Sequence, residues 1–320
     1  GISVALNSIG DLVAVGAKND EPAGLSGTDN LGLVYIFRSG SSGWTEETIL
    51  SGSFATDIDD NFGNSVDLNA SGNVLVVGAL QDERATGNES EGLAYIFRSG
   101  SSGWVEEAIL SGTLALDSYD NFGYSVTINS EGNKIAVGSW QDERISQDQN
   151  QNEGLVYIFN SGSSGWSQEA ILSGSLATSS YDNFGNCIKF NSDGNVIIVG
   201  AVYDEPSSEY SSDNRGLVYI FESGSSGWQE RFIISGSRSN NSLDSFGNSV
   251  TLDSTGNKVL IGAPLDEGIV DQTITIPSGS NYMFRLLDSY GDGWNGASME
   301  LYKNGSYEQT IGSTFTTGKL

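Results

Sequence analysis

Residues 62–79 read FGNSVDLNASGNVLVVGA, and residues 93–110 read LAYIFRSGSSGWVEEAIL. Each stretch holds two apolar segments separated by a short turn rich in glycine, serine or asparagine. Alternating apolar and polar side chains, as in residues 65–69, are typical of a β-strand with one buried face. The two stretches therefore predict four antiparallel strands, at 65–69, 74–78, 93–98 and 104–110, with a loop at 80–91.

The same pattern recurs along the chain with a period of 60 to 62 residues. The units start at Gly1, Gly63, Gly123, Gly185 and Gly247. A fixed period of this length indicates a stacked or circular repeat, because one unit cannot bury its apolar faces alone. Four antiparallel strands in each unit favour the blades of a β-propeller, and no helical periodicity appears. We therefore predict an all-β fold, with a propeller at 1–268 and a smaller β-rich domain at 269–320.

The fifth unit stops after its second strand, near residue 268. Four and a half units leave two possibilities open. Either further repeats precede Gly1, or a ring of five blades is completed by another segment. The chain begins on a glycine inside a repeat, so we expect a processed or partial chain.

Composition limits the function. The chain of 320 residues has 41 acidic and 14 basic residues, a net charge of −27. Such a chain repels nucleic acids and anionic membrane surfaces and attracts cations or basic partners. The simpler alternative is that acidity keeps an extracellular protein soluble. No apolar run reaches the ~20 residues that a membrane-spanning helix needs, so we expect no direct membrane insertion.

Histidine is absent, and Cys187 is the single cysteine. The first fact excludes Ser-His-Asp and Cys-His catalysis and every histidine-ligated zinc site. The second excludes an intrachain disulfide. Cys187 stands where the other units have Ser65, Ser125 and Ser249, so we interpret it as a small buried side chain and not as a reactive thiol.

Two short motifs recur in register with the strands. The first is Phe-Gly, at Phe62-Gly63, Phe122-Gly123, Phe184-Gly185 and Phe246-Gly247. The second is Gly-Ala-Pro at Gly262-Ala263-Pro264, with weaker copies at Gly16-Ala17, Gly78-Ala79, Gly138-Ser139 and Gly200-Ala201. Over residues 1–268 the chain resembles the FG-GAP repeats of the integrin α-subunit head and of secreted microbial and algal surface proteins. The resemblance implies a propeller of four-stranded blades, usually seven, on the outside of a cell.

The resemblance fails at the family's calcium loop, which lies between the first two strands of a repeat. Here that place holds short turns with at most two carboxylates, at 7–11, 69–73, 129–133, 191–195 and 253–257. Calcium requires six to eight oxygen ligands from a loop that can wrap around it. We therefore do not expect calcium in these turns.

Strand order predicts instead that acidic residues gather at the opposite end of the propeller. In a four-stranded antiparallel blade, the loop between the second and third strands and the connector to the next blade share one end. The loops carry Asp20, Glu21, Asp82, Glu83, Asp142, Glu143, Asp204, Glu205, Asp266 and Glu267, and the connectors carry Asp60, Asp120, Asp182 and Asp244. We predict that this face binds Ca²⁺, with Asp82, Glu83, Asp142, Glu143, Asp204 and Glu205 as candidate ligands, or that it docks a basic partner. The alternatives are turn-forming aspartates in the connectors and solvated loops at the pairs.

A tryptophan opens the fourth strand of each complete unit, at Trp44, Trp104, Trp166 and Trp228. Such a residue either stacks on a sugar or packs between adjacent blades, and we favour packing. Glu106 and Glu107 on the same strand indicate an outer edge that charge protects from aggregation. Four sequons would accept N-glycans in a eukaryotic secretory pathway, at Asn69, Asn88, Asn240 and Asn304.

Residues 288–296 read DSYGDGWNG. The stretch resembles a module appended to secreted proteins of bacteria and algae. Asp288, Asp292 and Asn295 could supply oxygen ligands to Ca²⁺, although the spacing matches no EF-hand. The alternative is a cluster of tight turns around a packed Trp294.

Together these features predict a secreted, non-enzymatic adhesion or structural module that is stabilised by Ca²⁺. Its partners would be other extracellular proteins or further copies of itself in a fibre or surface layer. A glycan-binding lectin is the alternative from another class, and a glycan array separates the two. A glycosidase needs only two carboxylates, so hydrolysis assays would test the enzyme alternative.

Overall fold

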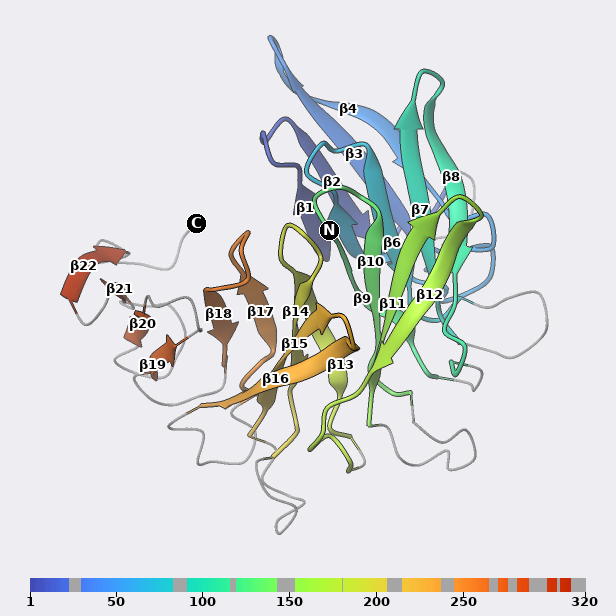
Figure 1. The fold of residues 1–320 in the computed structure, drawn as a ribbon. Helices are drawn as coiled ribbons and strands as arrows, with labels where there is room; N and C mark the ends of the chain where they lie inside the picture. Colours follow the sequence, from blue (N-terminus) through green and yellow to red (C-terminus); the bar gives the residue numbers. More distant parts are fainter. Residues whose placement is uncertain are drawn as a thin grey trace.

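The fold is that of a computed structural model, which is entirely β in the residues that it describes (Figure 1). It describes residues 1–22, 30–82, 91–115, 119–142, 153–179, 181–205, 215–236 and 245–264. It also gives the backbone of four strands between residues 270 and 311. The predicted all-β class is confirmed.

Four antiparallel sheets of four strands follow one another along the chain, each in the order in which its strands occur. Blade 1 contains β1 (Ser3–Leu6), β2 (Leu12–Ala17), β3 (Leu33–Gly40) and β4 (Gly43–Leu50). Blade 2 contains β5 (Phe62–Leu68), β6 (Val74–Ala79), β7 (Leu93–Gly100) and β8 (Gly103–Leu110). Blade 3 contains β9 (Phe122–Ile128), β10 (Lys134–Ser139), β11 (Leu155–Gly162) and β12 (Gly165–Leu172). Blade 4 contains β13 (Phe184–Phe190), β14 (Val196–Ala201), β15 (Leu217–Gly224) and β16 (Gly227–Ser235).

The fifth unit is a pair of short strands, β17 (Ser249–Leu252) and β18 (Val259–Gly262), as its sequence predicts. A separate four-stranded sheet follows, with β19 (Val270–Thr275), β20 (Asn281–Leu287), β21 (Ser298–Lys303) and β22 (Ser306–Ile311). Its strands pair with one another in sequence order. The domain boundary at residues 268 and 269 stays a prediction.

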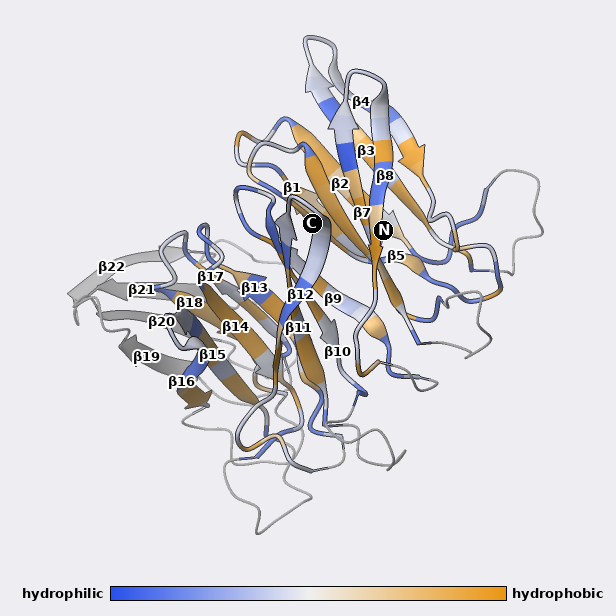
Figure 2. Cartoon of the chain, turned by 45° about the vertical axis from the view of Figure 1, so that its right-hand side comes forward, coloured by the Kyte–Doolittle hydropathy of each residue, from blue (hydrophilic) through white to orange (hydrophobic). Residues whose placement is uncertain are grey.

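The second strand of blade 2 is buried on both faces because blades 1 and 3 lie on either side of it. Every residue of β6 is buried, whereas exposed and half-buried residues alternate along most of β8. The hydropathy colouring of Figure 2 follows this division, with apolar residues along the inner strands and polar residues on β4 and β8. Apolar clusters fill the space between successive blades. The core is therefore a series of sandwiches between blades, as the repeat period requires.

The backbones of successive blades come into direct contact at the Phe-Gly motif. Ser65 Oγ of blade 2 donates a hydrogen bond of 2.8 Å to the carbonyl of Gly123 in blade 3. Cys187 occupies the same place in blade 4, and its Sγ lies 2.9 Å from the Gly247 carbonyl. A Cβ on Gly78 would lie 1.9 Å from the Gly123 oxygen, so no larger residue fits there. Burial raises the pKa of the Cys187 thiol to about 12, consistent with its interpretation as a non-reactive side chain.

An ion pair near the inner strands joins three blades. Lys189 Nζ of blade 4 lies 2.7 Å from Asp67 Oδ2 of blade 2, and Thr127 Oγ1 of blade 3 donates 2.9 Å to the same oxygen. Asp67, Thr127 and Lys189 occupy equivalent positions in successive units, but the residue type at this position differs from unit to unit. The contact could not be predicted from the repeat itself.

Candidate cation-binding face

The structure places the connectors beside the loops that follow the second strand, as strand order predicts. The Asn61 N–H donates 3.1 Å to the Asn30 carbonyl, which joins a connector to the loop of blade 1. In blade 4 the Tyr203 N–H donates 3.3 Å to the Asp182 carbonyl. We call this end of the molecule the loop face.

The first acid of the Asp-Glu pair is a buried structural residue in blades 2, 3 and 4, which argues against the alternative of a solvated side chain there. Asp82, Asp142 and Asp204 are each 1% exposed. Their carboxylates accept hydrogen bonds from the buried hydroxyls of Tyr95, Tyr157 and Tyr219. Burial and the neighbouring aspartate raise the pKa of each tyrosine, which keeps the hydroxyl as a donor. The hydrogen bond between aspartate and tyrosine thus ties the loop to the third strand of its own blade.

The backbone of the same aspartate closes its loop at both ends. The Asp82 N–H donates 3.3 Å to the Ala79 carbonyl, where β6 ends. The Asp82 carbonyl accepts 2.9 Å from the Gly92 N–H, just before β7 begins. The loop in between therefore varies in sequence without moving the strands. In blade 1 the equivalent Asp20 accepts 2.6 Å from Tyr35, whose pKa this hydrogen bond raises to about 12.

The connector aspartates form turns, which confirms the simpler of the two interpretations for two of them. Asp60 Oδ2 accepts 2.7 Å from the Asp57 N–H, and Asp182 Oδ2 accepts 2.7 Å from the Ser179 N–H. Asp60, Asp120 and Asp182 are all buried. The fourth predicted connector residue, Asp244, lies outside the described residues.

In blade 4 a connector aspartate and an Asp-Glu pair come together. Oxygens of Asp182, Asp204 and Glu205 lie within 4.8 Å of one another, and all three side chains are buried. Burial, together with the charges of Asp204, Glu205 and Glu153, raises the pKa of Asp182 to about 8. Three carboxylates in such a place suit a hard divalent cation, which would offset their repulsion.

The remaining candidate ligands are not brought together in the part of the chain that the structure describes. Asp82 and Asp142 each bind a tyrosine, while Glu83 and Glu143 lie outside the described residues. The described residues also do not include Asp266 and Glu267, nor Asp288, Asp292 and Asn295 of the last domain. For these side chains, calcium binding stays a prediction.

The turns between the first two strands hold their own backbone. Asn69 Oδ1 accepts hydrogen bonds of 3.0 Å from the N–H groups of Asn73 and Val74. Its Nδ2 donates 2.8 Å to Asn73 Oδ1, and the residue is 2% exposed. The sequon at Asn69 is therefore not an accessible glycan acceptor. The sequons at Asn88, Asn240 and Asn304 lie outside the described residues.

The repeated tryptophans join neighbouring blades, as favoured from the sequence. Trp104 Nε1 donates 3.0 Å to Glu47 Oε1 of the blade before it. Two further pairs repeat the contact, Trp166 with Glu107 at 2.9 Å and Trp228 with Glu169 at 3.2 Å. The sequence analysis did not identify the glutamate acceptors. The signal for them is the glutamate that follows Trp44 and Trp104 by three residues, at Glu47 and Glu107. Glu107 therefore does more than protect an edge strand.

Glu106 forms a second contact between blades. Its carboxylate accepts hydrogen bonds from the N–H and the hydroxyl of Ser53, at 3.0 and 2.7 Å. Glu230 holds Ser175 in the same way, at 2.9 and 2.7 Å. The outer strands are thus fastened to the preceding blade at two points.

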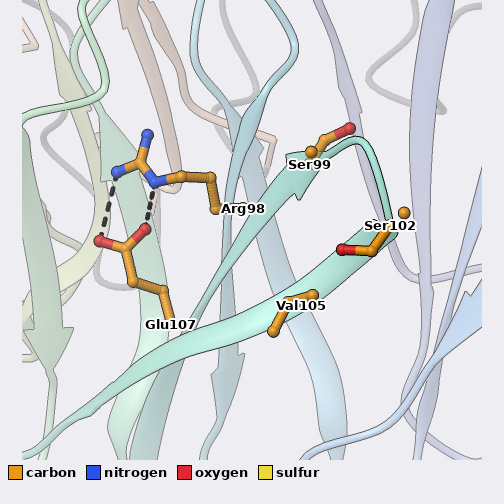
Figure 3. A pocket seen from close by; sticks show the side chains of 7 residues that line it. Arg98, Ser99, Ser102, Val105 and Glu107 are labelled. Atoms are coloured by element: carbon orange, nitrogen blue, oxygen red, sulfur yellow. Dashed lines mark hydrogen bonds and ion pairs between the residues drawn. The ribbon is translucent and has the colours of Figure 1, made fainter.

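The hairpin of blade 2 carries a shallow pocket lined by residues 98–100, 102, 103, 105 and 107. Figure 3 shows Arg98 and Glu107 pointing toward one another across β7 and β8, where they form an ion pair. Glu107 is already held by Arg98 and Trp166, which together lower its pKa. The pocket therefore offers little unengaged polar surface to a ligand.

Two segments of the chain, residues 44–97 and 104–159, match the model of the FG-GAP repeat family. The blades fit an FG-GAP β-propeller. Each match starts on the fourth strand of one blade and ends on the third strand of the next. No curated protein is significantly similar to the chain. Among the described residues, no helix is both long and apolar enough to pass through a bilayer.

Proposed function

We propose that this chain is an extracellular, non-enzymatic FG-GAP module that supports adhesion or surface assembly and is stabilised by a hard cation such as Ca²⁺. Its partners would be other extracellular proteins or further copies of itself. FG-GAP repeats are typical of extracellular proteins, and their family is generally non-enzymatic.

The observation that carries the proposal is the use of polar side chains for architecture. Asp82 binds Tyr95 inside one blade, and Glu47 and Glu107 bind tryptophans between blades. A catalytic acid or base needs a substrate within hydrogen-bond reach. These groups are directed at the protein itself, so they suit a rigid scaffold and not a reaction site.

The cation is supported by the cluster of blade 4. Asp182 and Asp204 are almost fully buried, and each carries a charge that raises the cost of ionising the other. With the net charge of −27, a bound cation would relieve repulsion both locally and over the loop face.

The lectin alternative would use tryptophan, tyrosine and aspartate side chains. Trp104, Trp166 and Trp228 pack against the clusters between blades and their N–H groups are engaged. Tyr119 and Tyr181 of the connectors are 58% and 59% exposed, so a glycan would have to stack on these rings. Trp44 is half exposed and stands at the position in blade 1 that Trp104 has in blade 2. We therefore rank protein recognition above glycan recognition.

The cation is tested by calorimetric titration of the metal-free protein with Ca²⁺, with Mg²⁺ as the comparison. We expect saturable heat and a rise in melting temperature, both lost in Asp182→Asn. Asp193→Asn, in an exposed turn, is the matched control and should leave both unchanged. Absence of heat and of any melting shift at millimolar Ca²⁺ would remove the cation from the proposal.

Adhesion is tested separately. Beads coated with the protein should bind extracellular matrix proteins or one another, and chelation should weaken this binding. A glycan array that gives specific, competable signals without protein binding would favour the lectin alternative. Turnover of a polysaccharide would contradict the non-enzymatic proposal.

A further inference from the structure

One buried amide distinguishes blade 4 from blades 2 and 3 on the loop face. In blade 2, Asn61 Nδ2 of the connector donates 2.7 Å to Gln81 Oε1. In blade 3, Asn121 Nδ2 donates to Gln141 Oε1 in the same way. Each glutamine directly precedes the aspartate of its Asp-Glu pair. The connector asparagine is therefore directed at the start of the loop that carries the acids.

Blade 4 has Asn183 at the asparagine position but Tyr203 in place of the glutamine. The backbone of Asn183 keeps the left-handed conformation of its equivalents, with φ of 58° compared with 58° at Asn61 and 56° at Asn121. Its side chain therefore starts toward the same part of the loop. Asn183 is 3% exposed, and its Oδ1 has no hydrogen-bond partner among the described residues. A buried acceptor without a donor is costly, which indicates that this oxygen binds a water molecule or an ion.

The amide adjoins the three carboxylates of the blade 4 cluster. Asn183 directly follows Asp182 in the connector. The N–H of Tyr203, which directly precedes Asp204 in the loop, donates 3.3 Å to the Asp182 carbonyl. Connector and loop are thus in contact at this point. Ligand oxygens of Asp182, Asp204 and Glu205 lie within 4.8 Å of one another, so the amide oxygen of Asn183 belongs to the same group of acceptors.

The chemistry of these four side chains favours a small hard cation. They are between 1% and 8% exposed, which favours a small ion over a side chain of another protein. Carboxylate and amide oxygens are the ligands that divalent cations such as Ca²⁺ take in proteins. A proton or a water molecule serves one or two such oxygens, whereas a cation contacts all four side chains at once.

We propose that Asn183 is a fourth ligand of the blade 4 cation site and that Tyr203 makes its amide oxygen available. This rests on the proposed function, because Asp182, Asp204 and Glu205 are taken to hold the cation. A glutamine at position 203 fixes the asparagine with its NH₂ group toward the loop, which turns the oxygen away. Tyr203 withholds that acceptor and leaves the oxygen for the cation, so it is a positioning residue and not a ligand.

The test is calorimetric titration of the full chain with Ca²⁺, applied to the site that Asp182→Asn abolishes. Asn183→Gly removes the amide at a position where glycine tolerates the left-handed backbone. Tyr203→Gln restores the acceptor of blades 2 and 3. We expect each variant to bind Ca²⁺ at this site at least tenfold more weakly than the wild type. Asn183→Asp, which keeps an oxygen at this position, should bind at least as tightly as the wild type, and Asn121→Gly is the matched control that should leave the affinity unchanged.

Each variant is first melted in a chelator to establish that it is folded. Wild-type affinity in Asn183→Gly would overturn the assignment of Asn183, and wild-type affinity in Tyr203→Gln would overturn the role of Tyr203. In both cases the loss of binding in Asp182→Asn would leave the proposed cation in place. A weaker site in Asn183→Asp, or an equal loss in Asn121→Gly, would also contradict the assignment. A wild type without heat or melting shift removes the cation itself.

Discussion

The indole N–H of Trp104 donates a 3.0 Å hydrogen bond to Glu47 Oε1 on the outer strand of the preceding blade. Glu47 is oriented by Arg38, with which it forms an ion pair on its own blade. The tryptophan therefore connects blade 2 to a group that blade 1 already holds in place. Because the contact recurs at Trp166 and Trp228, the repeat encodes its own interface.

Loss of the Tyr95 hydroxyl should destabilise blade 2. Tyr95→Phe keeps the buried ring and removes the donor to Asp82. We expect the free energy of unfolding to fall by about 1–3 kcal/mol, the cost of removing one partner from a buried polar pair. Urea unfolding measures it. Tyr35→Phe, which removes an exposed hydroxyl hydrogen bond in blade 1, is the matched control and should cost less.

A methyl group at Gly78 should separate blades 2 and 3. The added Cβ would lie 1.9 Å from the Gly123 carbonyl oxygen, so backbone must move. We expect Gly78→Ala to cost about 1–3 kcal/mol or more of stability. Gly100→Ala, where an added Cβ meets no atom within 4 Å, should be nearly neutral in the same thermal unfolding experiment. Equal effects of the two would argue against close contact at the Phe-Gly motif.

Cys187 should be replaceable by serine but not by valine. Serine can donate to the Gly247 carbonyl as Ser65 donates to Gly123, whereas valine leaves that carbonyl without a donor. We expect a change below about 1 kcal/mol for Cys187→Ser and a loss of about 1–2 kcal/mol for Cys187→Val. Since the thiol pKa is raised to about 12, a thiol reagent at pH 8 should label the protein only after unfolding. Rapid labelling of the folded protein would contradict this.

The cluster of blade 4 should make stability depend on pH when divalent cations are removed. The pKa of Asp182 rises from 3.8 to about 8, so the folded protein holds this proton more tightly than the unfolded chain. The stabilisation is complete below about pH 4 and is lost as the pH rises through 8. In a chelator, Asp182→Asn should raise the free energy of unfolding at pH 8.5 by about 1–3 kcal/mol and have little effect at pH 4. Addition of Ca²⁺ should restore the stability of the wild-type protein at pH 8.5. A free energy of unfolding that does not change between pH 4 and pH 8.5 in the chelator would contradict this role of the cluster.

The sequence was sufficient for the fold because each unit repeats the same alternation and the same turns. The strands predicted at 65–69, 74–78, 93–98 and 104–110 appear as β5, β6, β7 and β8, with boundaries that differ by at most three residues. The largest difference is at Phe62, which extends β5 across an irregular register between Phe62 and Ser65. That irregularity places Phe62 in the core and depends on the neighbouring blade.

The candidate site was predicted only in part. Strand order correctly places connectors beside loops, and the Asp182, Asp204 and Glu205 cluster follows from it. The burial of Asp82 and Asp142 could not be foreseen, because the tyrosine that binds each one lies 13 or 15 residues further along a different strand. The Asp67–Lys189 pair was missed for a similar reason, since its members are 122 residues apart.

Repeated side chains fasten each blade to the next, and a double-mutant cycle on Trp104 and Glu47 measures this contact. Trp104→Phe, Glu47→Ala and the double variant are compared with the wild type by urea unfolding. We expect a coupling energy of about 0.5–1.5 kcal/mol between Trp104 and Glu47, because either single change already removes the hydrogen bond that they share. Effects that simply add, to within about 0.3 kcal/mol, would contradict it.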